Sequence, residues 1–429
     1  MRKKLVILGA GPTGLCAADI LQAKFDVTLI EKANFLGGLA ASFEMEGQLI
    51  PKYYHHIVSH NHFTVNYLKR FNGLKDNEWK KVKVAVAVNK KFYITNNIKG
   101  LIDFFLRYKE LSLWAKFRLM LFGAYTIFLM KPNKIKDEKD AKSWLYTLAG
   151  KEVTDKFFYH LYGRNKFNIG LEYISAKQFA HRLDEREIYD QFTFPREKEG
   201  IQLLIDGLEK IITEKGVKIL RNFTTKNIDV KKKEIIGNKK IKYDILINTI
   251  PVPEFLKIAK ELPEDYEEKL KKLRYCPCVG LVFGTEDYLQ KGVYWTNLFN
   301  ERIHVIMQHS VLVDKYNSKI NWCIRYGGSE EDLYKSDEEI KELYLDVIKK
   351  YYPNAKIKWV KVFRELYAEP VYDKDYINYK PDYLTPVKDL YMSGVQVTFP
   401  KIRNINTALE SGINVSNIIL SSRYLADGT

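Results

Sequence analysis

Three glycines near the N-terminus have the spacing of a loop that binds phosphate. Gly9 permits a tight turn, Gly11 lets the backbone approach a pyrophosphate, and Gly14 lets a following helix pack closely on the preceding strand. The free N–H groups and the positive dipole end of that helix would then face the phosphates. The complete loop is Gly9-Ala10-Gly11-Pro12-Thr13-Gly14. This spacing predicts that the chain binds the pyrophosphate of a dinucleotide.

The elements that must position this loop lie on both sides of it. The apolar run Leu5 to Leu8 predicts a strand, residues 12–23 predict a helix, and Val27 to Ile30 predict a second strand. Glu31 and Lys32 close that second strand. A carboxylate about twenty residues after the second glycine accepts hydrogen bonds from the adenosine ribose. This context favours a dinucleotide site over a glycine turn without a ligand.

A second pair of glycines, Gly37 and Gly38, precedes Leu39. NAD-binding units do not usually carry this diglycine. With both glycine motifs, the sequence resembles the superfamily of amine oxidases, phytoene desaturases, protoporphyrinogen oxidases and UDP-galactopyranose mutases. The resemblance implies FAD as a held cofactor. It also implies an α/β fold, in which a Rossmann-like FAD-binding domain of the glutathione reductase type joins an α+β substrate domain with an antiparallel sheet and a helical insertion.

Half of the eight histidines lie between His55 and His62. Their spacing fits no common zinc pattern, so we predict no metal site. The segment resembles the family loop in which a Gly-Gly-His or Gly-Ala-His turn lies beside the flavin. His56 takes the position of that histidine, which implies that it positions the flavin or relays a proton, and His55 is placed among the cofactor contacts. Because Tyr54 and His55 replace the small residues, the space beside the flavin is expected to differ. A histidine-rich surface loop is the alternative interpretation.

The resemblance assigns further site residues in the middle of the chain. Thr225 falls where relatives touch the adenine, and Asn248 lies on the strand that leaves the FAD domain. Arg325 lies on a predicted strand with alternating apolar neighbours and is a second catalytic candidate if it points into the cavity. A surface or structural ion pair is the interpretation that we favour for Arg325.

Near the C-terminus, a predicted strand ends at Gly394 and a helix begins near Asn404, which is a plausible helix cap. In the family, this junction directs backbone N–H groups at the flavin, and the helix dipole stabilises charge on the reduced ring. The implied contacts are Gly394, Val395, Asn404, Ile405 and Asn406. Many relatives have Asp after the glycine, and galactopyranose mutases have an arginine that grips the substrate diphosphate. This chain has Val395 instead.

The resemblance also divides the chain, whose 429 residues are long for a single core. We expect three FAD-binding segments, residues 1–75, 196–252 and 386–429. Residues 76–195 would form a helical substrate or cap segment, and residues 253–385 an antiparallel-sheet substrate segment.

The formal charge of +16 favours anionic partners, which include acidic membranes, nucleic acid and phosphorylated substrates. Because no recognisable nucleic-acid-binding module accompanies the charge, we expect no nucleic acid and a small-molecule substrate, with phosphorylated or nucleotide-linked molecules included. The first strand follows Met1 almost at once without a signal peptide, which predicts a cytoplasmic location.

The region from Ile98 to Met130 is helical and strongly apolar, but its longest uncharged stretch, residues 119–130, is too short to span a bilayer. We favour helices buried in the substrate domain, with Arg107 and Lys116 on wet faces. The alternative is an interfacial surface around Trp114, as in the monotopic members of the superfamily, and hence peripheral membrane contact.

Two functions follow from the resemblance. The first is an FAD-dependent oxidoreductase of the amine oxidase or protoporphyrinogen oxidase-like type, in which flavin N5 accepts a hydride from a small organic substrate. The alternative is a redox-neutral mutase, similar to UDP-galactopyranose mutase, that acts on a nucleotide sugar in surface polysaccharide synthesis. Val395 argues against the mutase, because burying a diphosphate without its arginine partner is costly.

Overall fold

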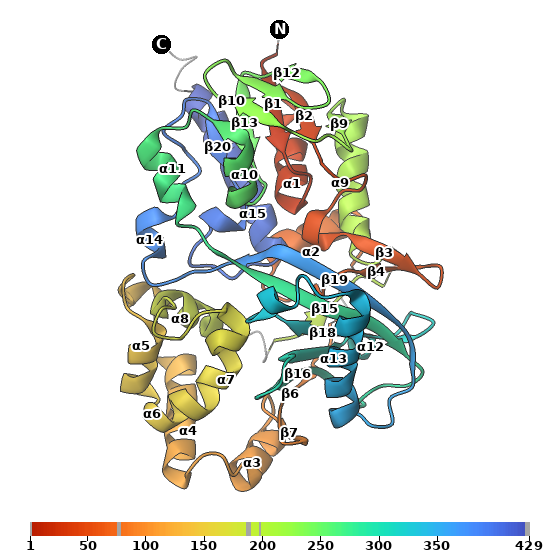
Figure 1. The fold of residues 1–429 in the computed structure, drawn as a ribbon, viewed down its shortest axis with the longest axis vertical. Coiled ribbons are helices and arrows are strands. Elements are labelled where there is room, and N and C mark those ends of the chain that lie inside the picture. The colour runs from red at the N-terminus through yellow and green to blue at the C-terminus, as the bar shows by residue number, and fades with distance from the viewer. Residues whose placement is uncertain (1, 75–78, 186–189, 197–198, 425–429) are drawn as a thin grey trace.

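A parallel sheet in one lobe of the molecule carries the glycine loop (Figure 1). The computed structural model describes residues 2–74, 79–185, 190–196 and 199–424. Within them, the sheet has the strand order β20-β13-β1-β2-β9, and every neighbouring pair is parallel. Its strands are apolar runs covered on both faces, as parallel sheets require. They are β1 (Lys4–Leu8), β2 (Asp26–Ile30), β9 (Lys218–Leu220), β13 (Ile245–Asn248) and β20 (Leu390–Met392).

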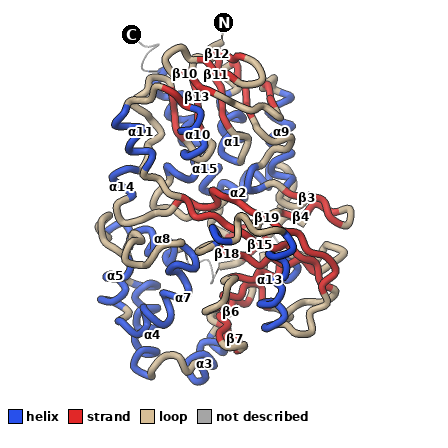
Figure 2. The backbone as a smooth tube through the Cα atoms, in the orientation of Figure 1, coloured by secondary structure: helices blue, strands red, loops and turns tan. Residues whose placement is uncertain are grey.

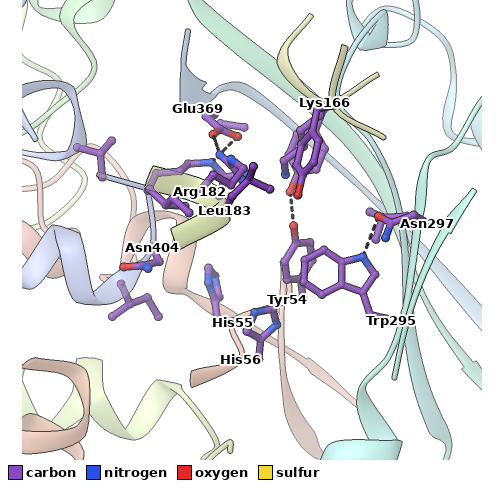
Figure 3. Close-up of a pocket in the computed structure, with 18 of the residues that line it drawn as sticks. Tyr54, His55, His56, Lys166, Arg182, Leu183, Trp295, Asn297, Glu369 and Asn404 are labelled. Carbon is purple, nitrogen blue, oxygen red and sulfur yellow. Dashed lines mark hydrogen bonds and ion pairs between the residues drawn. The ribbon is translucent and has the colours of Figure 1, made fainter. Parts of the chain in front are cut away.

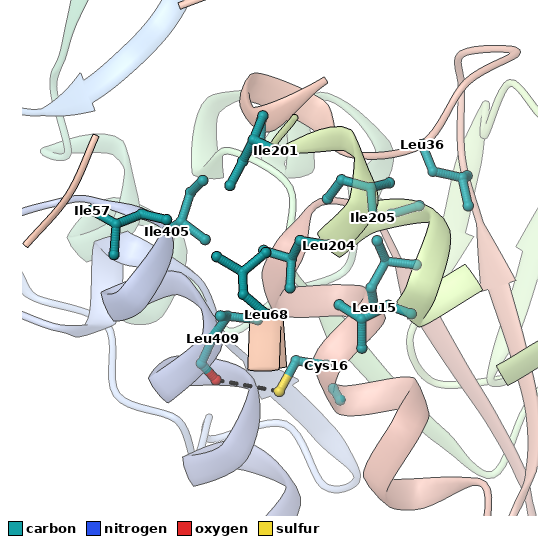
Figure 4. Close-up of a cluster of buried hydrophobic side chains, with 14 of the residues drawn as sticks. Leu15, Cys16, Leu36, Ile57, Leu68, Ile201, Leu204, Ile205, Ile405 and Leu409 are labelled. Atoms are coloured by element: carbon teal, nitrogen blue, oxygen red, sulfur yellow. Dashed lines mark hydrogen bonds between the residues drawn. The ribbon is translucent and has the colours of Figure 1, made fainter. Parts of the chain in front are cut away.

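The helices around this sheet come from distant parts of the chain. They are α1 (Pro12–Leu21), α9 (Gln202–Glu214), α10 (Val252–Ile258), α11 (Glu264–Lys271) and α15 (Ile405–Tyr424). α1 contacts both α9 and α15, and the buried side chains of Leu15, Leu204 and Leu409 meet between them (Figure 4). The thiol of Cys16 also donates to the carbonyl oxygen of Leu409 at 3.4 Å. The helix that follows the glycine loop is therefore fixed by the C-terminal helix.

A smaller sheet lies beside the parallel one, with the order β12-β11-β10-β14 among the described strands. Its strands are β10 (Asn227–Asp229), β11 (Glu234–Ile236), β12 (Lys240–Lys242) and β14 (Ala259–Lys260). The antiparallel pairing of β11 with β12 forms a hairpin that turns at Gly237 and Asn238.

The second lobe is built on a larger sheet, with the order β19-β15-β18-β17-β16-β6-β7 in the part of the chain that the structure describes. Neighbouring strands are antiparallel except for β16 and β6. The strands are β6 (Lys83–Val88), β7 (Lys91–Ile94), β15 (Tyr275–Thr285), β16 (Val293–Leu298), β17 (Val305–Gln308), β18 (Lys319–Arg325) and β19 (Ile357–Pro370). Two short pairs join the lobes: β3 (Ser42–Met45) with β4 (Gln48–Pro51), and β5 (Ile57–Val58) with β8 (Phe192–Thr193).

Helices α4 to α8 gather on one side of the second lobe and the strands on the other (Figure 2). The remaining helices are α2 (His62–Arg70), α3 (Ile98–Arg107), α4 (Leu113–Phe128), α5 (Ala141–Leu148), α6 (Lys151–Val153), α7 (Tyr159–Tyr162), α8 (Ala176–Asp184), α12 (His309–Leu312), α13 (Asp337–Tyr351) and α14 (Tyr376–Tyr379). α6 and α7 flank a π-helical stretch, Thr154–Phe158. Residues 140–162 do not form one helix, because α5 ends before Gly150, whose φ of +90° marks the break.

The expectation that the apolar region from Ile98 to Met130 is buried is wrong for much of its surface. Leu113 is 72% exposed and Trp114 65% exposed, whereas Lys116, which we expected on a wet face, is 6% exposed. Ser112 caps α4 by accepting from the N–H of Ala115, so the region forms two helices. No helix among the described residues is long and apolar enough to cross a membrane.

Candidate functional site

One cavity of about 1260 Å³ extends from the glycine loop in the first lobe to α4 in the second. Ordinary ligand pockets have roughly 300–1,000 Å³. The cavity therefore has room for a large ligand and for a second molecule beside it. Its walls come from the start of α1, the end of β2, the junction before α15 and the aromatic residues of both sides of the second lobe.

The glycine loop forms the tight end of this cavity. Gly9 has a φ of +95°, and a Cβ there would lie 2.8 Å from Thr249 Oγ1. A Cβ on Gly14 would lie 2.0 Å from the carbonyl oxygen of Gly9. A Cβ on Gly11 would meet no described atom within 4 Å, because Gly11 faces the cavity. α1 begins next at Pro12, so the N–H groups of its first turn are available to a phosphate.

Glu31 is held at the edge of the cavity by two backbone groups. Its Oε2 accepts from the N–H of Ala10 and its Oε1 from the N–H of Ala33, each at 2.9 Å. A carboxylate oxygen has a further lone pair, so both oxygens can also accept from a ribose hydroxyl. The N–H of Gly37, which has a φ of +105°, donates to Ala10 O at 2.8 Å. The diglycine turn thereby supports the first glycine loop.

The junction before α15 supplies the opposite wall. Asn404 caps this helix, since its Oδ1 accepts from the N–H of Thr407 at 2.8 Å. Gly394 has a φ of +106°, which favours glycine. Both residues line the cavity, as do Val395 and Ile405. The positive dipole end of α15 therefore faces the cavity and would stabilise negative charge on a bound ring.

His55 and His56 both line the cavity, but their contacts differ (Figure 3). Nε2 of His55 donates to Leu39 O at 2.8 Å. Burial lowers the pKa of His55 to about 4, so this ring is neutral at pH 7. Nδ1 of His56 lies 3.0 Å from the hydroxyl of Tyr294, and the ring of His56 packs edge-on against Phe192. His56 is thus fixed by aromatic neighbours with one ring nitrogen in a hydrogen bond.

An aromatic wall continues from His56 into the second lobe. The hydroxyls of Tyr54 and Tyr326 are 2.9 Å apart, and the ammonium of Lys166 lies 3.9 Å from the centre of the Tyr326 ring. Nε1 of Trp295 donates to Asn297 Oδ1 at 3.0 Å. These side chains, of which Figure 3 labels Tyr54, Lys166, Trp295 and Asn297, supply apolar surface with a few polar groups. Such a lining is typical of a substrate pocket.

Sequence reasoning missed a charged cluster in the same cavity. Nη2 of Arg182 lies 2.8 Å from Glu369 Oε1 (Figure 3). Nε of Arg403 lies 3.1 Å from Glu369 Oε2. Burial opposes ionisation of Glu369, but the charges of Arg403 and Arg182 outweigh it and lower the pKa of Glu369 to about 2. With Lys166 nearby, three cations accompany one carboxylate, so the cluster favours an anionic ligand. No sequence spacing links these four residues, because the fold alone brings them together.

Several predicted site residues lie outside the cavity lining of the described structure. Arg325, the second catalytic candidate, instead forms ion pairs with Asp332 at 2.6 Å and Glu331 at 3.2 Å. This corrects the catalytic candidacy of Arg325 and confirms the structural ion pair that we favoured from the sequence.

The other residues outside the lining have contacts that explain their positions. Asn406 Oδ1 accepts from the N–H groups of Phe63 and Thr64 at the start of α2. Asn248 is buried and donates to Ile250 O at 3.2 Å. Thr225 belongs to the loop before β10. Ala10, Gly14 and Gly37 belong to the two glycine loops but do not line the cavity.

The predicted residues that the structure does gather around the cavity form a continuous set. They are Gly9, Gly11, Pro12, Thr13, Glu31, Lys32, Gly38, Leu39, His55, His56, Gly394, Val395, Asn404 and Ile405. They come from the N-terminal and C-terminal parts of the chain, so a ligand held by them would contact both parts. The glycine cradle, the carboxylate at the strand end and the volume fit a dinucleotide with a ring system, as FAD requires.

A family model described as flavin containing amine oxidoreductase matches residues 12–420. No curated protein matches the chain. Solved structures share its fold at low identity. Reduced UDP-galactopyranose mutase has a TM-score of 0.77 at 17% identity, with 98% of this chain and 94% of that chain covered.

An oxidoreductase from Methanosarcina mazei has a TM-score of 0.74 at 16% identity, with 96% of this chain and 100% of that one covered. Putrescine oxidase bound to putrescine has a TM-score of 0.71 at 14% identity, with 98% and 99% covered. At these identities the likeness establishes the fold, and it includes both an oxidase and a sugar mutase.

Proposed function

The chain belongs to the flavin-containing amine oxidoreductases, and from this premise we propose that it oxidises a small organic substrate held beside His56. It is an enzyme, and its cofactor is FAD. When bound, FAD would supply the acceptance of a hydride from the substrate and the transfer of its electrons to oxygen or another acceptor. One observation carries the proposal: a single cavity joins the glycine loop to an aromatic chamber, so cofactor and substrate can lie side by side in one continuous cavity.

The residues around the tight end of the cavity would hold FAD. The first turn of α1 would bind the pyrophosphate, and Glu31 would accept hydrogen bonds from the ribose. The cap of α15 at Asn404 would place the positive end of that helix at the ring. The glutathione reductase type of this domain, and its assembly from residues 1–75, 196–252 and 386–429, are part of the same proposal. The parallel sheet supports it by taking strands from all three segments.

His56 and the aromatic wall would act on the substrate. Phe192 fixes the ring of His56, and the Tyr294 hydroxyl at 3.0 Å from Nδ1 offers a partner for moving a proton. Tyr54, Tyr326 and Trp295 exclude water and orient an apolar substrate. The chain's own contribution is therefore orientation, a dry site and a positioned proton carrier.

A redox-neutral mutase acting on a nucleotide sugar is the second candidate. The sequence argued against it because Val395 replaces the arginine that grips a diphosphate. Arg182, Arg403 and Lys166 line the same cavity and offer cations from other elements, which is the observation that favours this candidate. The fold shared with reduced UDP-galactopyranose mutase is compatible with either function.

Absorbance spectroscopy of the purified holoenzyme separates the two functions. Bleaching of the flavin bands by an anaerobic substrate, with recovery in air, identifies an oxidoreductase. Conversion of a nucleotide sugar only after dithionite reduction, without consumption of an acceptor, identifies the mutase. His56→Phe should lower turnover with FAD content unchanged, whereas the matched variant His60→Gln should not, because His60 pairs with Asp190 outside the cavity lining. Protein that purifies colourless and takes up no FAD would refute both candidates.

A further inference from the structure

The outer surface of α3 and α4 is covered by exposed apolar side chains. Twelve of the nineteen large hydrophobic residues that are exposed in the described part of the chain lie between residues 98 and 129. Exposed patches of this kind mark interaction sites rather than ordinary surface. We call this patch the α3–α4 face. It consists of Ile98, Leu101, Ile102, Leu106, Leu113, Trp114, Phe117, Met120, Leu121, Ile127, Phe128 and Leu129.

The face lies at the end of the molecule opposite the two termini and the parallel sheet (Figure 1). The sheets and helices of the described fold therefore leave it uncovered. Phe128 and Ile98 are each 79% exposed, although both are strongly apolar. Stacking of Trp114 on Phe117, with ring centres 5.6 Å apart, gives the face a broad aromatic element. Tryptophan is the side chain that favours the boundary between water and lipid.

Positive charge accompanies the apolar face. Residues 98–136 contain eight basic and two acidic residues. Lys99 on α3 and Lys109 just after α3 are exposed, and so are Lys131 and Lys134 just after α4. An apolar face with a basic border matches a bilayer whose headgroups are anionic. A second copy of the chain would bring the same excess of positive charge to the contact, which disfavours self-association through this face.

The same face contains one end of the cavity. Leu101, Met120, Ile127 and Phe128 are exposed and also line the cavity. Behind them, in the direction of the first lobe, the lining is mainly apolar, with Lys116 and Thr126 as polar members. Its apolar residues are Phe104, Phe105, Leu119, Phe122, Phe157, Phe158 and Leu161. An apolar molecule that leaves a lipid layer at this point would remain out of water until it reaches the aromatic wall at Tyr54 and Trp295.

We propose that the α3–α4 face rests on an anionic bilayer, and that the substrate is an apolar molecule dissolved in that bilayer which enters the cavity through the face. The docking part is independent of the proposed chemistry. The substrate part rests on the proposed oxidoreductase function, and it disfavours a water-soluble nucleotide sugar. Because no described helix spans a bilayer, the protein lies on the surface by partial insertion of the two helices.

Flotation of the holoenzyme with vesicles tests the docking. We expect binding to phosphatidylcholine vesicles that contain a quarter phosphatidylglycerol, and much weaker binding to pure phosphatidylcholine. Leu113→Ser with Trp114→Ser should weaken binding by roughly tenfold or more. The matched control is Tyr334→Ser with Leu384→Ser, two residues 90% and 60% exposed outside this face, and it should bind as the unmodified protein does.

Further outcomes decide against the proposal. Absence of binding to anionic vesicles overturns the docking, and so does a dimer in size-exclusion chromatography that Trp114→Ser converts to a monomer, because a second copy would then cover the face. Quenching of tryptophan fluorescence by brominated lipids should fall in Trp114→Phe. An unchanged quenching contradicts insertion at this point.

Gly123→Leu tests the route for the substrate. Gly123 lines the cavity on α4, and a Cβ there would meet no described atom within 4 Å, so leucine fills the passage without displacing the protein. We expect the fluorescence of diphenylhexatriene added to the holoenzyme to fall severalfold, with vesicle binding and the flavin spectrum unchanged. If diphenylhexatriene binds equally to Gly123→Leu and to the unmodified holoenzyme, the proposed substrate route is wrong. A colourless protein that still floats with vesicles would refute the proposed flavin chemistry and leave the docking intact.

Discussion

Gly14 packs so close to Gly9 that a Cβ at Gly14 would lie 2.0 Å from the carbonyl oxygen of Gly9. At Gly11, two residues after Gly9, a Cβ would meet no described atom within 4 Å. The fold itself therefore requires glycine at position 14, whereas only a molecule in the cavity requires glycine at position 11. This difference separates folding from cofactor binding in an experiment.

Gly11→Ala should fold as the natural sequence does and bind FAD at least tenfold more weakly, because its methyl group occupies the space of a pyrophosphate. Gly14→Ala should instead destabilise the protein even without cofactor, since helix and turn must separate. Thermal unfolding of the apo-proteins and titration with FAD measure the two effects. Normal FAD affinity in Gly11→Ala would contradict the assignment of the loop.

Arg325→Met should lower the free energy of unfolding by about 3 kcal/mol, because it leaves the carboxylate of Asp332 buried with one cation fewer. Asp332 is fully buried and Arg325 is 12% exposed at its side chain. FAD content should not change, since Arg325 is outside the cavity lining of the described residues. Urea denaturation gives the loss in stability.

Arg364→Met is the matched control for this variant. Arg364 pairs with Asp337, whose side chain is 48% exposed, so the pair contributes little in water. We expect a loss below about 1 kcal/mol. An equal loss in both variants would show that the buried pair at Arg325 has no special role.

The sequence predicted the parts of the site that depend on local geometry. The strand, glycine turn and helix from Lys4 to Leu21 were predictable because each glycine has a local steric reason, and the match to the flavin-containing family confirms the resemblance drawn from them. The cap at Asn404 was predictable for the same reason. Such features need only a few neighbouring residues.

Long-range contacts account for what the sequence did not predict. Lys166, Arg182, Glu369 and Arg403 are far apart in the chain, and nothing in their local sequence indicates that they share one cavity. The exposure of α3 and α4 was missed because an apolar helix pattern does not state what covers the apolar side. For Arg325 the sequence left a catalytic role open beside the favoured ion pair, since strand alternation does not say which face of the sheet borders the cavity.

Glu369→Gln should make the protein less stable and more responsive to anions. The variant leaves Arg182 and Arg403 close together without the carboxylate that lies within 3.1 Å of both. Buried cations without a partner cost stability, and an anion that binds them restores it. Inorganic pyrophosphate should therefore raise the melting temperature of Glu369→Gln more than that of the unmodified holoenzyme. Equal shifts in both proteins would argue against an anion site at this cluster.

Acid should destabilise the protein well above the pH at which carboxylates titrate. Burial lowers the pKa of His309 to about 3 and that of His304 well below 6.5. His304 Nε2 also accepts from the N–H of Tyr326 at 2.8 Å, so the folded protein keeps it neutral. Below the unfolded pKa of about 6.5, the unfolded chain takes up protons that the folded protein refuses.

The stability from these rings is therefore complete above about pH 6.5 and is lost as the pH falls towards the folded pKa values, at about 1.4 kcal/mol per pH unit for each histidine. His309→Gln should reduce the slope of unfolding free energy between pH 6 and pH 5 by about 1.4 kcal/mol per pH unit, because glutamine does not titrate. Urea denaturation of the apo-protein across this range provides the slope. A slope that His309→Gln leaves unchanged would mean that the ring takes up its proton in the folded protein and that its burial does not keep it neutral.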